Sequence, residues 1–269
     1  MVSKAAITLA VVLSAFSATA ASIDRRIVGG EDAKDGDFPF VVSITLTNRI
    51  CGGALLDSTT VLTAASCLRG SVSVRAGSLQ HRAGGTEAKI ASRKPHPDYK
   101  LNKRNPALPF ADNDIGIIKL SRPIEIGNNI SYATLAEDGS DPVVGSMATV
   151  AGWGQQEPMF ALLAEAAEFM ANVSIPIHAR EVCAKMDADV GDRDTVICAG
   201  GKGKNGCLYD GGSPLIDEET KQVIGVTSWG IRDKNGDFCG QAPTLFTRVG
   251  RYISFIHENM GGSPVDAKF

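Results

Sequence analysis

Side chains that could do chemistry gather in nine residues of the C-terminal third of the chain. These residues are Cys207-Leu208-Tyr209-Asp210-Gly211-Gly212-Ser213-Pro214-Leu215. Hydrolysis by a hydroxyl nucleophile needs a base beside the hydroxyl, a carboxylate that orients the base, and donors for the developing oxyanion. The stretch holds a carboxylate in Asp210 and an aliphatic hydroxyl in Ser213, but no histidine. A base for such chemistry therefore has to come from another part of the chain.

The composition gives little support for a metal site or for binding to nucleic acid. No cluster of His, Cys and Asp has the spacing of metal ligands, so we expect no metal site and no cofactor. The formal net charge is −3, and removing residues 1–26 takes away three positive charges and one negative charge, which leaves about −5. Without a basic run, the chain offers no electrostatic footprint for nucleic acid or for an anionic membrane.

Short β-runs separated by turn residues dominate the chain from Phe38 onward, which is typical of a β-sandwich or β-barrel. Helical patterns are confined to Phe160–Met170, His178–Met186 and Gly250–Met260. The β-runs are Phe40–Thr47, Gly53–Leu56, Val61–Ala64, Ser73–Ala76, Ile115–Leu120, Ala148–Gly152, Val173–Ile177, Val196–Cys198, Val223–Trp229 and Leu245–Val249. We therefore expect an all-β fold.

The N-terminus has the pattern of a secretory signal. Lys4 is followed by the apolar run Ala5–Phe16 and by the small residues Ala18-Thr19-Ala20. The run is shorter than the roughly 20 residues that a membrane span needs. We expect residues 1–20 to be a signal peptide and the protein to be secreted and extracellular; a buried N-terminal helix is the alternative.

Residues 21–26 end in the dibasic pair Arg25-Arg26, a processing signal. We expect 21–26 to be a propeptide, 27–260 the folded domain and 261–269 a loose tail. Six cysteines in a secreted chain suggest three disulfides, for which 15 pairings are possible. Asn129 and Asn172 begin Asn-x-Ser sequences and are candidate glycosylation acceptors if they are exposed.

The order and spacing of the motifs resemble those of trypsin-like serine proteases, including the fungal trypsins, over nearly the whole chain after residue 26. The stretch 207–215 resembles the family's nucleophile loop, Cys-x-Gly-Asp-Ser-Gly-Gly-Pro. The other matching motifs are Cys51–Leu56, Val61–Ala65, Val74–Ser78, Asp112–Leu120, Gly152–Gly154, Ser228–Gly230 and Thr247–Val249. The resemblance implies two packed six-stranded antiparallel β-barrels, a C-terminal helix and a site in the cleft between the barrels. It also implies the disulfides Cys51–Cys67, Cys183–Cys198 and Cys207–Cys239.

The resemblance also locates the catalytic positions. Ser66 stands where the family has its histidine base, and a hydroxyl cannot accept a proton near neutral pH. Asp114 stands at the orienting carboxylate, and Gly211 stands at the nucleophilic serine. We expect no competent catalytic group at these positions, and we expect Asp114 to be a buried carboxylate bonded to Ser66 and backbone amides. Rescue by Ser213 or by a histidine is the alternative; the histidines are His81, His96, His178 and His257.

The remaining site positions are changed as well. Tyr209 replaces an oxyanion-hole glycine, so it should either reshape the loop or project its ring into the cleft, as filler or as an anchor for a partner. Asn205 replaces the aspartate of the specificity pocket and is neutral. Thr244 replaces a glycine and should narrow the pocket, while Gly230 is retained.

The resemblance implies a further pair in the mature protein. Cleavage before Ile27 would create an amine that turns inward to Asp210, because a buried ammonium and a buried carboxylate must pair. Two stretches beside the cleft, Lys100–Ala111 and Gln155–Met170, depart from the family in length and suggest a remodelled rim.

From these positions we expect a secreted trypsin homologue that is not an enzyme and that acts by binding a protein partner. It would be an inhibitor, a decoy or a modulator of a proteolytic cascade, similar to the glucanase-inhibitor proteins of plant pathogens. Asn205 and Thr244 argue against a decoy for inhibitors that insert Lys or Arg. The alternative is a trypsin-like serine endopeptidase with residual or altered hydrolytic activity.

Overall fold

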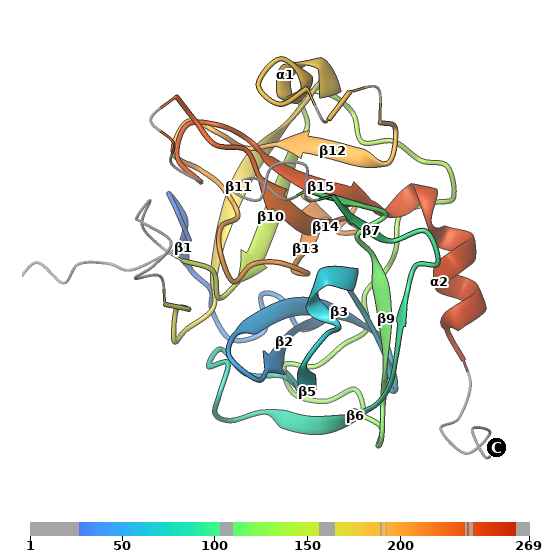
Figure 1. Ribbon diagram of the computed structural model, residues 1–269. Coiled ribbons are helices and arrows are strands. Elements are labelled where there is room, and N and C mark those ends of the chain that lie inside the picture. The colour runs from blue at the N-terminus through green and yellow to red at the C-terminus, as the bar shows by residue number, and fades with distance from the viewer. Residues whose placement is uncertain are drawn as a thin grey trace, which may run out of the picture.

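The computed structural model describes residues 27–261, except 103–109, 156–164, 189, 192, 235, 237 and 238. Closed antiparallel β-structure forms twice along the chain, once in each half. In Figure 1 the barrel built by the N-terminal half, blue to green, lies below the barrel built by the C-terminal half, yellow to red. Residues 1–26 and 262–269 lie outside the described residues, so the signal peptide, the propeptide and the tail stay predictions.

The first barrel closes in the order β2-β3-β4-β9-β6-β5. Inward-facing positions carry branched apolar side chains such as Ile44, Leu62 and Ile117, which are almost completely buried. Closure leaves no strand edge unpaired around the ring. The strands are β2 (Val41–Leu46), β3 (Ile50–Asp57), β4 (Thr60–Thr63), β5 (Ser71–Ala76), β6 (Thr86–Pro95) and β9 (Gly116–Leu120).

The second barrel follows the order β11-β10-β13-β14-β15-β12 and is closed by pairing between β11 and β12. In β11 every second residue is buried, the alternation expected of a strand with one face in a core. The short strand β1 (Glu31–Asp32) is added to β11 outside the ring. The ring strands are β10 (Met147–Gly152), β11 (Ala171–His178), β12 (Val196–Ala199), β13 (Pro214–Asp217), β14 (Val223–Gly230) and β15 (Thr244–Arg248).

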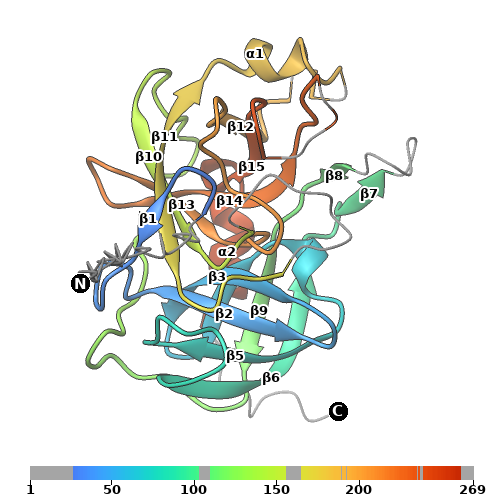
Figure 2. The ribbon, with the colours of Figure 1, turned by 90° about the vertical axis from the view of Figure 1, so that its left-hand side faces the viewer.

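The remaining elements are short. Strands β7 (Lys100–Asn102) and β8 (Phe110–Asp112) form a separate pair that stands out on one side of the molecule, at the level where the barrels meet (Figure 2). The helices are the 3-10 turns η1 (Ala65–Cys67) and η3 (Val249–Arg251) and the α-helices α1 (Arg180–Ala184) and α2 (Ile253–Asn259). No helix among the described residues is long and apolar enough to cross a membrane.

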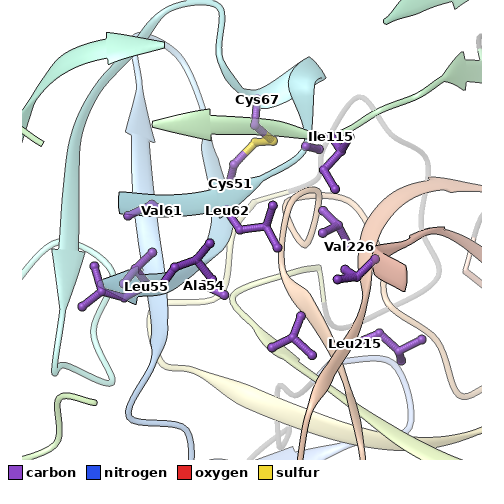
Figure 3. Close-up of a cluster of buried hydrophobic side chains, with 14 of the residues drawn as sticks. Cys51, Ala54, Leu55, Val61, Leu62, Cys67, Ile115, Leu215 and Val226 are labelled. Carbon is purple, nitrogen blue, oxygen red and sulfur yellow. A yellow bond between two sulfur atoms is a disulfide. The ribbon is translucent and has the colours of Figure 1, made fainter. Parts of the chain in front are cut away.

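One apolar cluster extends from the first barrel into the second. Leu55 and Leu62 of the first barrel share it with Leu215 and Val226 of the second, and Figure 3 shows these side chains in one close-up with Ile115. The barrels also approach closely at Gly52, where a Cβ atom would lie 1.9 Å from Ser213 Oγ and 2.8 Å from Ser213 Cα. Only a residue without a side chain fits at this point of the interface.

Most of the predicted architecture is confirmed. The structure has the two six-stranded barrels and the C-terminal helix, and its disulfides are Cys51–Cys67, Cys183–Cys198 and Cys207–Cys239, the pairs that the resemblance implied. Among the strands of the two barrels, the predicted β-runs omit β6 and β13, and they also omit the short strands β1, β7 and β8. Strand β6 shows only one buried position in ten residues, so it lacks the apolar alternation that marks a strand.

The predicted helix over Phe160–Met170 is wrong in its described part. Residues 165–170 are not helical, and 160–164 lie outside the described residues. Ala167 N donates to Trp153 O at 3.0 Å, and Met170 N donates to Leu79 O at 2.8 Å. The backbone groups of this segment find partners in both barrels, which replaces the hydrogen bonds of a helix.

The close contact between Gly52 and Ser213 generates a test. We expect Gly52→Ala to lower the free energy of unfolding by about 1–3 kcal/mol, the usual cost of overpacking. Ser213→Gly in the same chain should recover part of this loss, because it removes Cβ and Oγ but leaves Cα. Denaturant unfolding of the wild type, both single variants and the double variant measures the coupling. Strictly additive effects would show that the two residues do not press on each other.

Candidate active site

A buried carboxylate joins the two barrels at the site. Asp114 lies between β8 and β9 and is 2% exposed. Its Oδ1 accepts a hydrogen bond from Ser66 N at 2.8 Å, and its Oδ2 accepts from Ser66 Oγ at 3.0 Å and from Ser228 Oγ at 2.6 Å. Ser66 belongs to η1 of the first barrel and Ser228 to β14 of the second. Asp114 is thus held in the position that the sequence predicted, bonded to Ser66 and backbone.

Burial governs the protonation of this carboxylate. It raises the pKa of Asp114 above the ordinary value, although hydrogen bonds from Ser228, Ser66 and the Ala65 amide act in the opposite direction. A raised pKa makes Asp114 a stronger base than an exposed aspartate. Ser66 Oγ is half-buried and already donates to it, so this hydroxyl has the contact through which a proton could be transferred.

At the position of the nucleophile, Gly211 offers no side chain. Its carbonyl oxygen accepts from Gly52 N at 2.9 Å and lies 3.3 Å from Cys67 Sγ. A Cβ atom at residue 211 would meet Cys67 Sγ at 3.7 Å, an ordinary van der Waals contact, and the φ of Gly211 is not in the left-handed region. A Cβ atom at this position would therefore fit without rearrangement.

Among the described residues, no hydrogen bond joins Asp114 to the side chain of Ser213 or of a histidine. Ser213 is completely buried, and its Oγ has no hydrogen-bond partner among the described residues. The ring of His96 packs edge-on against Tyr252 and Phe255. The other histidines are placed as follows: His81 is buried beside Glu168, His178 Nε2 is 2.8 Å from Gly200 O, and His257 lies on α2. The described contacts give no support to rescue by these residues.

Tyr209 has a left-handed backbone conformation, which glycine adopts more readily than tyrosine. Its φ is 74°, in the left-handed region, which costs a non-glycine residue roughly 1–2 kcal/mol. The ring is half-buried and packs against a cluster that includes Phe38, Phe40 and Trp153. Of the two expectations, the loop therefore keeps its turn, and the ring serves at least in part as filler.

The predicted specificity-pocket residues form one hydrogen-bonded group. Asn205 is fully buried, and its Oδ1 accepts from Gly201 N at 2.7 Å. Its Nδ2 donates to three carbonyl oxygens, those of Cys239 (3.0 Å), Gly240 (3.0 Å) and Ala242 (3.1 Å). Thr244 is 2% exposed, and its Oγ1 donates to Gly206 O at 3.0 Å. The pocket base is therefore neutral and its polar groups are already satisfied.

One edge of β14 remains open beside this pocket. Its last residues, Ser228–Gly230, are half-buried and pair with β15 on one side, where Gly230 faces Thr244. On the other side, pairing with β13 ends at Val226, and no described strand continues it. Within the described residues, the end of β14 therefore has one edge without a strand partner.

At this edge Trp229 contacts Phe110, and Phe110 contacts Arg193; the sequence did not predict this cluster. The rings of Trp229 and Phe110 lie 6.1 Å apart, and the Arg193 guanidinium lies 4.5 Å above Phe110. Arg193 NH1 also lies 2.6 Å from Asp112 Oδ1. The motif Ser228-Trp229-Gly230 drew attention to Trp229 in the sequence. No sequence pattern predicted that Arg193 would contact residues of strand β8.

Both residues of the predicted activation pair are buried in the uncleaved chain. Asp210 is fully buried, with Oδ1 accepting from Gly154 N at 2.7 Å and Oδ2 accepting from Cys207 N at 2.9 Å. Ile27 is also fully buried, but its nitrogen belongs to a peptide bond until the chain is cleaved. Burial raises the pKa of Asp210 to about 7, against the effect of its two backbone hydrogen bonds. Pairing with the Ile27 amine stays a prediction.

The described residues contain no group of three or more side chains that could hold a metal ion. Two closed barrels with a carboxylate held between them define the class of trypsin-like serine proteases. The family model described as Trypsin matches residues 27–256, and the chain belongs to that family.

Named relatives match the chain over most of their length. It is 33% identical to Trypsin Blo t 3 of Blomia tropicalis over 86% of this chain and 84% of the relative. It is 30% identical to Kallikrein 1-related peptidase b22 of Mus musculus over 90% of this chain and 92% of the relative. The solved structure of mouse neuropsin, described as a serine protease, superposes with a TM-score of 0.76 at 26% identity, covering 87% of this chain and all of that one.

The expectation that the chain is not an enzyme is contradicted by these comparisons. The relatives are named trypsins and kallikrein-related peptidases, and the solved structure is called a serine protease. The expectation rested on two side chains, Ser66 and Gly211. Such substitutions change which groups can move a proton or attack a carbonyl carbon. They leave the barrels and the Asp114 carboxylate of the peptidase family in place.

The raised pKa of Asp210 predicts how the stability of the uncleaved chain changes with pH. Below pH 3.8 the carboxyl is protonated in both the folded and the unfolded chain. Between there and about pH 7 the unfolded chain releases its proton first, so the free energy of unfolding should fall by about 1.4 kcal/mol per pH unit. Urea unfolding from pH 3.5 to 8 measures this fall.

The matched control for this experiment is Asp210→Asn. Asp114, whose pKa is also raised, contributes to both proteins equally, so the difference between them isolates Asp210. Equal pH dependence in wild type and variant would show that Asp210 is ionised over the whole range. Cleavage before Ile27 should also remove the fall, because an ammonium would stabilise the carboxylate.

Proposed function

We propose that this trypsin-family chain is a secreted protein that recognises extended polypeptides in the cleft between its barrels. The observation that carries the proposal is the free edge of β14 at residues 228–230, beside a neutral, narrowed pocket. An extended peptide can add to such an edge through backbone hydrogen bonds, and side-chain pockets beside the edge then supply selectivity.

The pocket favours a small, uncharged side chain. Asn205 has no carboxylate to pair with Lys or Arg, and its amide hydrogens are engaged by three carbonyl oxygens. The Thr244 side chain occupies the space that a glycine would leave open. A cationic side chain would enter without a counterion and would lose its hydration, which is costly in a buried site.

Hydrolysis of the bound polypeptide by an altered set of groups is the second candidate function. The observation that favours it is the 3.0 Å contact between Ser66 Oγ and Asp114 Oδ2, together with the peptidase names of the relatives. In this route Asp114 takes the proton of Ser66 as Oγ attacks the carbonyl carbon, and returns it to the leaving amine. Water then releases the acyl group from Ser66. If bound polypeptides are released uncut, recognition alone would suit an inhibitor, decoy or cascade modulator.

Peptide selectivity tests the recognition proposal. We expect peptides with Ala or Ser at the pocket position to bind at least about tenfold more tightly than the same peptides with Phe or Arg, since pocket contacts of this size are worth roughly 1–3 kcal/mol. Thr244→Gly should reduce this preference, while Thr244→Ser, which keeps the hydroxyl bonded to Gly206, should change it less. Fluorescence polarisation of labelled peptides measures the affinities. Preference for Arg or Lys, or no binding at millimolar concentration, would reject the proposal.

Product analysis by mass spectrometry tests the hydrolytic route. Peptide cleavage that depends on Ser66 should fall at least about a hundredfold in Ser66→Ala, because loss of a nucleophile removes the covalent step. A contaminating protease would cleave equally in both preparations. Cleavage that survives both Ser66→Ala and Asp114→Asn in pure protein would exclude the route.

A scaffold control accompanies this test. Ser66→His with Gly211→Ser restores the family's base and nucleophile, and residue 211 has room for a side chain. The double variant should react with a serine-directed phosphonate at residue 211 at least about a thousandfold faster than Gly211→Ser alone. Equal labelling rates would mean that the Asp114 carboxylate and the turn at Tyr209 no longer support attack by a serine at residue 211.

A further inference from the structure

An exposed asparagine lies at the tip of a tight turn between β9 and β10. The turn is closed by two backbone hydrogen bonds, from Gly127 N to Ile130 O at 3.2 Å and from Ile130 N to Gly127 O at 3.1 Å. Asn129 occupies the left-handed region with φ at 61°, a conformation that asparagine tolerates better than most residues. The turn therefore presents the Asn129 side chain to solvent at a fixed place.

The residues that follow Asn129 anchor the turn, whereas its own carboxamide stays open. Ile130 is 8% exposed and lies close to Gly77, and Ser131 N donates to Pro39 O at 3.0 Å. No described residue makes a hydrogen bond with the Asn129 carboxamide. Its Oδ1 lies near Gly36, where a built Cβ atom would be 3.4 Å away, an ordinary van der Waals distance, and residue 129 is exposed.

The second Asn-x-Ser sequence lies in a different environment. Asn172 is a half-buried residue of β11, paired with Glu31 of β1 on one side and with Ala151 of β10 on the other. Its Nδ2 donates to Glu31 O at 3.4 Å. A Cβ atom on Gly30 would lie 2.2 Å from Asn172 O, so the chain before β1 passes directly over this residue. A sugar on Asn172 Nδ2 would therefore compete with the contact to Glu31 O in β1.

We propose that Asn129 is the N-glycosylated residue of this protein and that Asn172 is unmodified in the folded chain. The proposal rests on secretion, since the oligosaccharide donor, a lipid diphosphate, belongs to the secretory pathway. Nδ2 of Asn129 forms a bond to the anomeric carbon, the bond from that carbon to the diphosphate oxygen breaks with its electron pair, and the amide nitrogen loses a proton. Ser131 supplies the hydroxyl of the acceptor sequence.

A glycan on this turn would also cover an apolar side chain. Ile126, three residues before Asn129 in the same turn region, is 64% exposed, and residues 125–129 are all exposed. A branched polar chain on Asn129 would shield this isoleucine from other molecules, which reduces association through exposed apolar surface. The unglycosylated protein should therefore be the less soluble form.

Expression of the full chain behind a host signal peptide in a eukaryotic secreting cell line tests the assignment, because the host peptide ensures entry into the secretory pathway. Intact mass is measured before and after treatment with peptide-N-glycosidase, which converts a glycosylated asparagine to aspartate, and peptide mapping then locates the conversion. We expect one glycan, at residue 129. Asn129→Gln and Ser131→Ala should each abolish the mass shift completely.

The matched controls are Asn172→Gln and Ser174→Ala, which should leave the mass shift unchanged. A glycan at residue 172, a mass shift that persists in Asn129→Gln, or wild-type protein without any glycan would each overturn the proposal. Failure here would leave polypeptide recognition untouched, because the peptide-binding assay uses the cleft and can be run on Asn129→Gln. The same variant should aggregate at lower concentration than the glycosylated wild type, as measured by light scattering.

Discussion

The hydrogen bonding of one buried carboxylate holds the site together. An isolated charge of this kind would be costly in the interior, so Asp114 is stable there only because donors from both barrels reach it. Ser66 brings the first barrel to the carboxylate and Ser228 brings the second. The same contacts place the half-buried Ser66 hydroxyl beside the Asp114 carboxylate, whose pKa is raised by burial. The hydrogen bonds that hold the two barrels together at the site therefore also bring together a proton donor and a proton acceptor.

The residues that differ from the family pattern still stabilise the local structure through packing and hydrogen bonds, even where they change the chemistry that the site could perform. Tyr209 accepts a left-handed backbone and compensates through ring packing against the cluster around Trp153. Asn205 uses its amide to bind three carbonyl oxygens, so a residue in the place of a ligand-binding aspartate has become part of the scaffold. The polar groups of Asn205 and Thr244 are thus satisfied within the chain, and neither residue brings a charge to this part of the site.

A close packing requirement links the site to the rest of the fold. Ser213 lies between the barrels where Gly52 leaves room for it, and its hydroxyl is enclosed without a described partner. Gly154 stands equally close to the Asp210 carboxylate, where a Cβ atom would lie 1.9 Å from Oδ2. Glycines at these two contacts let the nucleophile loop approach both barrels, and the loop conformation depends on them.

The short β-runs and their turn residues predicted an all-β fold, whereas the two barrels, the three disulfide pairs and the burial of Asp114 were implied by the resemblance of the motifs to the trypsin family. Strand β6 was not predicted because most of its residues are exposed and it lacks apolar alternation. The conformation of residues 165–170 was not predicted because their local pattern is helix-like and their backbone partners are distant in sequence. The tertiary structure alone decided that Ser228 reaches Asp114, that Arg193 covers Phe110 and that Asn129 rather than Asn172 has an open carboxamide. The first two contacts join residues that are far apart in the sequence, and no local pattern encodes a distance across the fold.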